Sequence, residues 1–387
     1  MTFKGYRRKD GSVGVRNYVA VIPTVGCVNE AAWRISREVD GCAPFLHHQG
    51  CCQLSPDIAQ IQRVLVGLGN NPNVGAVLLV SLGCETICAE EVKNLISPKK
   101  QVALVRLQEL GGLTSTVAEG VQEARNLVSE IRQDRVAADM RGLTVGVKCG
   151  ASDATSGIAA NPATGAAVDM LVDQGATVIF GETTEVLGAE HILANRAIDK
   201  AVGTRLIEKV QQMEGRVKAF GVDMRGGQPT PGNIRGGITT IEEKSLGAIV
   251  KGGNRPIKGV LEYGESPTSP GLYFMDSPGR EMEFLTGVVS GGSQIILFTT
   301  GVGAPQGFPL VPVIKITGNL KTYQRLEEHM DVDVSNIIEG TESVEEAGNR
   351  ILDSILEKAS GKPVKAEITG YDASGINTNI YATGPVI

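Results

Sequence analysis

The stretch "GAVLLVSLG", residues 75–83, is followed shortly by the helical pattern "AEEVKNLI" at 89–96. A short apolar run bounded by glycine is typical of a buried strand. The same alternation recurs along the first half of the chain, from "NYVAVIPTV" (17–25) to "ATVIFGET" (176–183). Strand alternating with helix over this length predicts an α/β fold with a doubly wound, mainly parallel sheet.

A Gly/Pro-rich segment, "FGVDMRGGQPTPGNIRGG" (220–237), interrupts this alternation. Because it carries charged side chains between periodic segments, we interpret residues 220–240 as an active-site loop. Beyond it, the strand-like runs "QIILFTTG" and "VPVIKIT" alternate with helices expected around 321–330 and 343–360. The sequence therefore predicts two parts, an α/β domain over 1–219 and a second, smaller α/β region over 220–387.

Composition excludes several classes of function. The chain has 387 residues, a net charge of −6 and a pI near 5.5, which argues against general binding to nucleic acid or to an anionic membrane. No apolar run is long enough to span a membrane, and the N-terminus lacks the pattern of a signal peptide. A cytoplasmic protein is expected, in which the seven cysteines serve metal binding or catalysis rather than disulfides.

Thiols follow the predicted strands one after another. Cys27, Cys51, Cys84 and Cys149 each come at or just after the end of a strand-like run, next to glycine. In one parallel sheet these positions share the carboxyl edge, where such folds place their ligands. With His47 and Glu85 they predict a site for a soft metal. The alternative for any single cysteine is ordinary packing as a small apolar residue.

Two further segments carry polar side chains suited to an anionic substrate. "GASDATSGIAANPATG" (150–165) offers Ser152 and Asp153 beside a helix expected to begin with Asn161 as N-cap. It could equally be an elaborate capped turn.

The second segment is "RGGQPTPGNIRGGITTIEEKSLG", which begins at Arg225. Arg225 and Arg235 can clamp a carboxylate, and Lys244 can carry a proton. For Lys244 and its acidic neighbours, a solvated helix face is the alternative.

The strings "GYRRKDGSVGVRNYVAVIPTVGC", "HHQGC", "LGCE", "KCGASDATSGIAANPATG", "PTPGNIRGGITTIEEKSLG" and "MDSPGREMEFLTGVVSGGSQIILFTTGVGAPQGFPLVPVIKITGN" together resemble the altronate/galactarate dehydratase family. This family also includes the large subunit of sulfolactate sulfo-lyase. The resemblance covers nearly the whole chain. It implies dehydration of a sugar acid to a 2-keto-3-deoxy acid, or expulsion of sulfite from sulfolactate, with a divalent metal, usually Fe²⁺, and Mn²⁺ as an option.

The resemblance and the chemistry of elimination together give a set of expected roles. Metal ligands would be His47, Cys51, Cys84 and Cys149, and acid–base groups would be His47, Glu85 and Lys244. Contacts to the substrate would come from Ser152, Asp153, Arg225 and Arg235. A [4Fe-4S] cluster held by the strand-end cysteines is the rival arrangement.

The resemblance also implies partners. Single-chain members carry a small β-rich domain ahead of "GYxRxDGRxGVRN", whereas this sequence begins almost at that motif. We therefore expect the large subunit of a two-component enzyme, with a separate small β-rich subunit and a homo-oligomeric assembly. The substrate would be a sugar-acid or sulfo-acid anion. A non-catalytic anion-binding or redox-sensing protein remains the alternative of another class.

Overall fold

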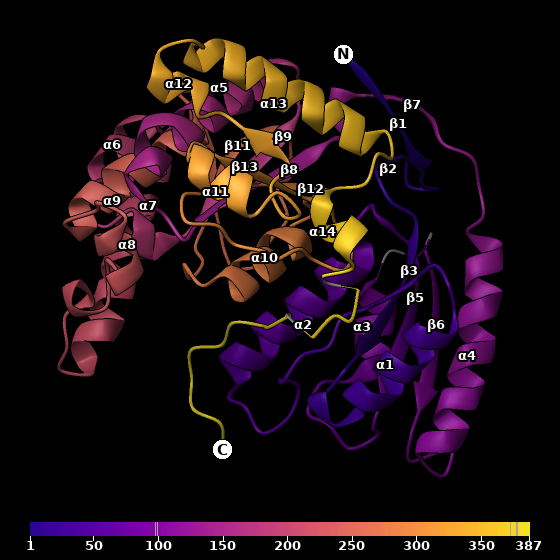
Figure 1. Ribbon diagram of the computed structural model, residues 1–387. Coiled ribbons are helices and arrows are strands. Elements are labelled where there is room, and N and C mark those ends of the chain that lie inside the picture. The colour runs from indigo at the N-terminus through magenta and orange to yellow at the C-terminus, as the bar shows by residue number, and fades with distance from the viewer. Residues whose placement is uncertain (97, 99, 372, 377) are drawn as a thin grey trace.

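The computed structural model describes residues 1–96, 98, 100–371, 373–376 and 378–387. Its elements form two lobes, each built around a parallel sheet (Figure 1). None of the described helices is long and apolar enough to cross a membrane. The α/β fold class predicted from the strand–helix alternation is confirmed.

The smaller sheet belongs to the N-terminal lobe and has the order β4-β3-β5-β6, with all neighbours parallel. Helices cover both of its faces, so its strands are apolar along almost their whole length. The strands are β3 (Tyr18–Pro23), β4 (Cys42–Pro44), β5 (Val74–Ser81) and β6 (Gln101–Arg106). The helices are α1 (Asn29–Glu38), α2 (Ser55–Asn70), α3 (Ala89–Leu95) and α4 (Leu113–Glu130).

The larger sheet has seven parallel strands in the order β10-β11-β9-β8-β12-β13-β14. Strand order reverses beside β8, which creates the crevice that open α/β sheets use for ligands. The strands are β8 (Thr144–Gly150), β9 (Thr177–Gly181), β10 (Ile257–Leu261), β11 (Gly271–Met275), β12 (Ile295–Thr300), β13 (Val313–Thr317) and β14 (Val332–Asp333).

Ten helices accompany this sheet among the described residues. They are α5 (Asn161–Asp173), α6 (Glu190–Asn195), α7 (Lys200–Ala219), α8 (Pro231–Arg235), α9 (Ile241–Ile249), α10 (Glu281–Ser290), α11 (Leu320–Arg325), α12 (Asn336–Glu339), α13 (Val344–Ala359) and α14 (Lys365–Thr369).

A small antiparallel sheet ties the beginning of the chain to the connection between the lobes. β1 (Thr2–Arg7) pairs with β2 (Val13–Gly14) and with β7 (Val136–Asp139). The two lobes also share one apolar cluster, in which Phe45 of the smaller lobe contacts Phe308 of the larger. Helix α10 lies in this cluster and packs against α2, so the lobes bury a common core.

The sequence predicts one parallel sheet across the first half of the chain, but in the structure the strands of this half belong to two parallel sheets. β8 and β9 join the strands that follow residue 257, so the sheets divide the chain between β6 and β8 rather than near residue 219. Between them, β7 pairs antiparallel with β1 in the small sheet. Local periodicity identifies strands, but it does not reveal which strands are neighbours.

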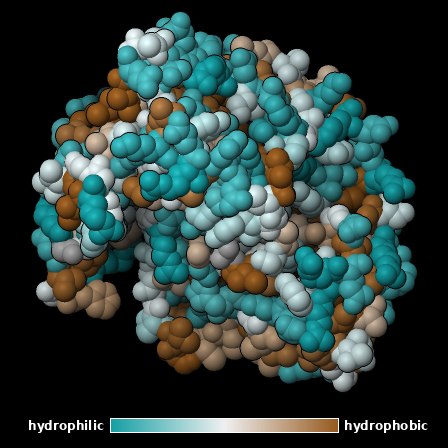
Figure 2. All heavy atoms as spheres, in the orientation of Figure 1, coloured by the Kyte–Doolittle hydropathy of each residue, from teal (hydrophilic) through white to brown (hydrophobic). Residues whose placement is uncertain are grey.

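The Gly/Pro-rich segment 220–237 is not a bare loop, since it contains α8 and a 3-10 helix at Met224–Gly226. It projects from the larger lobe at the lower left of Figure 1. Phe220 is 86% exposed there, and Figure 2 shows hydrophobic side chains at the tip of this projection, as at several other places on the same face.

Candidate active site at the carboxyl edge of the larger sheet

A buried group of polar side chains lies where β8 and β9 end. Cys149 is the penultimate residue of β8, Glu182 follows β9, and Glu185 ends the 3-10 helix Thr183–Glu185. Glu182 Oε2 accepts a hydrogen bond from the Cys149 backbone N–H at 3.0 Å, and the Cys149 thiol donates to Glu185 Oε2 at 2.7 Å. All three residues are buried, so these contacts form in a water-poor environment.

Three lysines neutralise these carboxylates. Lys251 Nζ lies 2.6 Å from Glu182 Oε2, and Lys148 pairs with the other oxygen of the same carboxylate. Lys244 Nζ, on α9, lies 3.0 Å from Glu185 Oε1. Buried charges of this kind are tolerated only when each has a partner, as here.

The pKa values follow from this charge balance. Burial raises the pKa of the Glu185 carboxyl, but the charges of the three lysines outweigh burial and lower it to about 2. Burial lowers the pKa of Lys148, whereas Glu182 and Glu185 more than reverse this and raise it. Burial and the adjacent carboxylates raise the pKa of the Cys149 thiol. At neutral pH the cluster therefore holds an ionised Glu185, a charged Lys148 and a protonated thiol.

The backbone at Glu182 is held in an uncommon conformation. Its φ is +72°, in the left-handed region that non-glycine residues seldom adopt. This turn directs the carboxylate back toward β8, where it meets the Cys149 N–H and two ammonium groups. Conformations of this kind cost about 1–3 kcal/mol and cluster at functional sites.

The same residues could hold a metal ion. One ligand atom each from Cys149, Glu182 and Glu185 lies within 4.8 Å of the others. Two carboxylates and the thiolate that Cys149 would form by releasing its proton suit a divalent transition metal. Lys251 Nζ stands 3.0 Å from the Cys149 sulfur, so the ammonium group and a metal compete for the same donors.

A cavity of about 250 Å³ is linked to this cluster through Lys244, which lines the cavity and pairs with Glu185. Lys244 borders it, together with Ser152, Asp153 and Asn161. Asp153 is buried, accepts a hydrogen bond from Asn319 Nδ2 at 2.8 Å, and accepts another from Thr155 Oγ1 at 2.6 Å. The structure thus brings together three residues expected at the site from sequence, namely Ser152, Asp153 and Lys244.

Asn161 was predicted to be the N-cap of α5. That prediction is wrong, because Asn161 is the first residue of the helix and Ala160 precedes it as the N-cap. A π-helical turn, Ser156–Ala160, runs directly into α5, and the side chain of Asn161 points away from the helix end. Its Nδ2 donates to the Gly247 carbonyl at 2.8 Å, and its Oδ1 accepts from Thr299 Oγ1 at 2.6 Å. Asn161 therefore ties α9 and β12 to this wall of the cavity.

The two arginines expected to clamp a carboxylate lie elsewhere. Arg225 is exposed and already paired with Asp223 and Glu242, at 3.2 Å each. Arg235 is exposed at the end of α8. Neither lines the cavity, because α8 and the projecting segment carry both side chains outward.

His47 lies at the carboxyl edge of the smaller sheet, with both ring nitrogens occupied. Nε2 donates to the Pro23 carbonyl at 2.7 Å, and Nδ1 accepts from the Gln49 N–H at 3.2 Å. Burial, with a further contribution from His48, lowers the pKa of His47 to about 4. This arrangement is that of a neutral structural histidine that orders the loop after β4.

Other expected ligands share that edge of the smaller sheet and not the cluster around Cys149. Glu85 accepts hydrogen bonds from Thr24 Oγ1, from Ser81 Oγ at 2.6 Å and from the Gly83 N–H at 2.7 Å, which lower its pKa despite its partial burial. Cys84 is exposed and Cys51 is half-buried. All seven cysteines are free, as expected.

Sequence reasoning missed Glu182, Glu185, Lys148 and Lys251. The available signal was "FGETTE" directly after a strong apolar run, because carboxylates at a strand end lie at the ligand-binding edge. Lys148 sits inside the run "LTVGVKCG", where a charge in a buried strand is itself unusual.

Comparison with known proteins agrees with this architecture. The model of the D-galactarate/altronate dehydratase C-terminal domain matches residues 140–382, and the second-domain model of D-galactarate dehydratase/altronate hydrolase matches residues 5–132. These two ranges separate the larger-sheet lobe from the smaller-sheet lobe.

Curated relatives cover most of the chain. A protein of Chromohalobacter salexigens named (2R)-sulfolactate sulfo-lyase subunit beta is 39% identical over 96% of this chain and 95% of its own length. Altronate dehydratase of Bacillus subtilis is 35% identical over 95% of this chain and 75% of its own length. Galactarate dehydratase (L-threo-forming) of Escherichia coli is 36% identical over 99% of this chain and 77% of its own length.

Proposed function

Because the chain belongs to the D-galactarate/altronate dehydratase family and is a lyase, we propose that it eliminates water from a 2-hydroxy sugar acid such as altronate or galactarate, giving a 2-keto-3-deoxy acid. The observation that carries this proposal is the cavity bordered by Lys244, with the Cys149/Glu182/Glu185 cluster directly behind it. The cavity presents a cation, a carboxylate and hydroxyl groups to a small polar acid.

Elimination from a 2-hydroxy acid builds negative charge on the substrate carboxylate as the α-proton leaves. A positive charge fixed beside that carboxylate stabilises the transition state. Lys244 supplies this charge, because Glu185 holds its ammonium group at the cavity wall. The α-proton passes to a water molecule of the cavity, and the same ammonium group donates the proton that turns the departing hydroxide into water. The lysine amine then regains its proton from solvent, so the net change is the loss of one water molecule from the substrate. Ser152 and Asp153 bind the hydroxyl groups of the substrate.

Cys149, Glu182 and Glu185 would hold a divalent metal ion, for which we propose Fe²⁺, with Mn²⁺ as the second choice. Such an ion supplies Lewis acidity that polarises the substrate carboxylate and its hydroxyl group. A [4Fe-4S] cluster requires three or four thiolates, whereas the ligand group found among the described residues contains one.

Sulfite elimination from sulfolactate is the second candidate. It is favoured by the 39% identity to the sulfo-lyase subunit beta, a match that extends over almost the full length of both chains. The chemistry at the α-carbon is the same, and the leaving group differs. That relative is named as a subunit, so we also propose a separate small subunit as partner.

The test is an activity panel with altronate, galactarate and sulfolactate, performed with Fe²⁺ and with and without the candidate small subunit. Formation of a 2-keto acid without sulfite supports the dehydratase, and release of sulfite from sulfolactate supports the second candidate. Lys244→Met should lower kcat by about 10²-fold or more. A wild-type protein that is inactive on all three acids with the small subunit present would contradict both.

A further inference from the structure

A second charged pocket, unrelated to the candidate active site, lies at the opposite edge of the smaller sheet. It has a volume of about 210 Å³ and is bordered by Gly75 at the start of β5 and Gln101 at the start of β6. Five cationic side chains line it against two acidic ones, although the whole chain carries a net charge of −6. Positive charge is therefore concentrated here.

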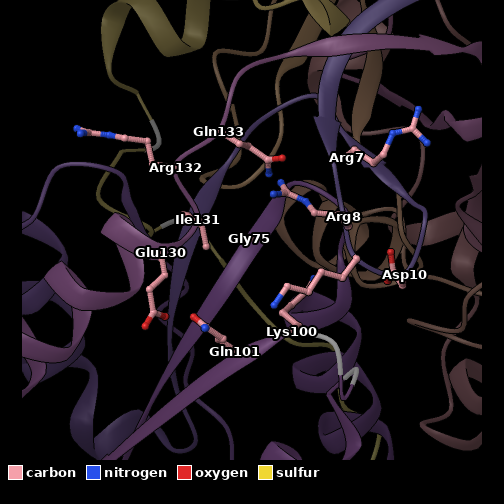
Figure 3. Close-up of a pocket in the computed structure, with 11 residues that line it drawn as sticks. Arg7, Arg8, Asp10, Gly75, Lys100, Gln101, Glu130, Ile131, Arg132 and Gln133 are labelled. Atoms are coloured by element: carbon pink, nitrogen blue, oxygen red, sulfur yellow. The ribbon is translucent and has the colours of Figure 1, made fainter.

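Arg8 reaches this pocket, and within the part of the chain that the structure describes its guanidinium donates to neutral groups. Nε donates to the Pro72 carbonyl at 2.7 Å, Nη2 donates to the Arg16 carbonyl at 2.8 Å, and Nη1 donates to Asn17 Oδ1. Figure 3 shows its head group and the Gln133 amide turned toward each other at the centre of the pocket, whereas Arg132 points away.

Lys100 brings a second cation to the same place. Its Nζ donates to the carbonyls of Gly69 at 2.8 Å and of Asn71 at 3.0 Å, at the end of α2. An ammonium group has three protons, and these two carbonyls, which are its acceptors among the described residues, leave one for a ligand. Burial, and then the charge of Arg8, lower the pKa of Lys100 to about 7, and burial lowers the pKa of Arg8 to about 10.

Neither of these cations has a carboxylate partner at contact distance among the residues that the structure describes. Asp10 raises the pKa of both from longer range, while its own carboxylate accepts bonds from the Ser12 N–H and hydroxyl. Two half-buried like charges whose hydrogen-bond acceptors are neutral oxygens are costly, and the more distant charge of Asp10 offsets only part of that cost. An anion between them removes that cost, and the pocket has the room to admit one.

We propose that this pocket is a binding site for a compact oxyanion, held by Arg8 and Lys100 and oriented by the Gln133 amide. The ligand class comprises phosphate, sulfate and small carboxylates, which share oxygens able to accept from a guanidinium and an ammonium group. The site lies at the amino ends of β5 and β6 and is separate from the elimination chemistry.

Isothermal titration calorimetry with inorganic phosphate, sulfate and acetate, at constant ionic strength in chloride, tests the proposal. We expect saturable binding of at least one of them to wild type, and at least tenfold weaker binding to Lys100→Met. Lys321→Met, which removes an exposed lysine elsewhere, should bind as wild type does. Tighter binding of the tetrahedral anions would identify phosphate or sulfate as the class, and tighter binding of acetate a carboxylate.

Loss of binding in Lys100→Met could also result from misfolding of that variant, so a second variant is needed. Gln133 is exposed, so Gln133→Glu should fold normally while placing a negative charge at the centre of the pocket. Binding should again weaken at least tenfold. Affinities unchanged in both Lys100→Met and Gln133→Glu, or no binding of any of the three anions to wild type, would overturn the proposal.

Discussion

Two edges of this molecule carry cysteines at the carboxyl ends of parallel strands, and they are built in opposite ways. At the larger sheet, Cys149 is buried among the carboxyl groups of Glu182 and Glu185 and the lysine side chains that pair with them. At the smaller sheet, Cys84 is exposed, both ring nitrogens of His47 have backbone partners, and Glu85 accepts three hydrogen bonds from its own lobe. The edge of the larger sheet contains charged side chains shielded from water. At the edge of the smaller sheet, the hydrogen bonds stabilise the conformation of the loops.

The two edges differ in how well their strand-end residues can stabilise charge in a reaction. Electrostatic stabilisation is strongest where charges are fixed and water is excluded. Lys244 and Glu185 meet that condition beside a cavity. A histidine whose two nitrogens already have backbone partners does not, because it would have to break those bonds to bind a metal.

The largest effect is expected at the larger sheet. Glu185→Gln removes the charge that anchors Lys244 and one candidate metal ligand. Activity should fall by about 10²-fold or more, as removal of a group central to acid–base catalysis does. Steady-state kinetics measure this, with Glu208→Gln, on the exposed face of α7, as the matched control. Activity of Glu185→Gln within threefold of wild type would contradict the assignment of catalysis to the larger sheet.

At the smaller sheet, His47 should affect stability and not chemistry. Its pKa is about 4 in the folded protein and near 6.5 when unfolded, so the unfolded chain binds more protons between these values. Stability is therefore lost as pH falls, by roughly 2 kcal/mol between pH 7.5 and pH 5.

Urea unfolding at the two pH values measures this contribution. His47→Gln should lose that part of the pH dependence, while His191→Gln, at an exposed position, should keep it. An unchanged pH dependence in His47→Gln would contradict the structural role assigned to the ring.

The smaller edge is further held by the end of the chain. Asp57, in the first turn of α2, accepts hydrogen bonds from the backbone N–H groups of Thr383 at 2.9 Å and Gly384 at 2.8 Å, and the Ile387 N–H bonds to the Cys52 carbonyl. Asp57→Asn should destabilise the protein by about 1–2 kcal/mol, because the bonds lose their charge assistance. Urea unfolding against Asp40→Asn, an exposed control, measures this, and equal stability of the two variants would contradict it.

The smallest effect is expected at the exposed thiols. Cys84 accepts a weak bond from Gln108 Nε2 at 3.4 Å and lies on the other sheet from the cluster. Cys84→Ser should keep activity within about twofold and stability within about 0.5 kcal/mol, as surface substitutions do. A large loss of activity in this variant would instead show that Cys84, at the edge of the smaller sheet, belongs to the catalytic site.

The sequence was informative wherever the signal was local. Apolar runs such as 75–83 predicted strands correctly. The small polar residues after β8 led to the prediction of substrate contacts at Ser152 and Asp153, which line the cavity; their role stays a prediction. The division into two sheets depends on long-range pairing, because β8 is the neighbour of β9 and β12 and not of β6, and no local pattern carries that information. Glu182 and Glu185 were missed because "GETTE" is typical of an exposed turn, and only the fold buries it among lysines.

The most direct test of the account is the metal content of protein purified without oxygen and loaded with Fe²⁺, compared between Cys149→Ser and Cys84→Ser. If the Cys149/Glu182/Glu185 cluster is the metal and elimination site, Cys149→Ser should lose most of the bound iron and Cys84→Ser should retain it. Loss of iron in Cys84→Ser with full retention in Cys149→Ser would place the site at the smaller sheet and contradict the account.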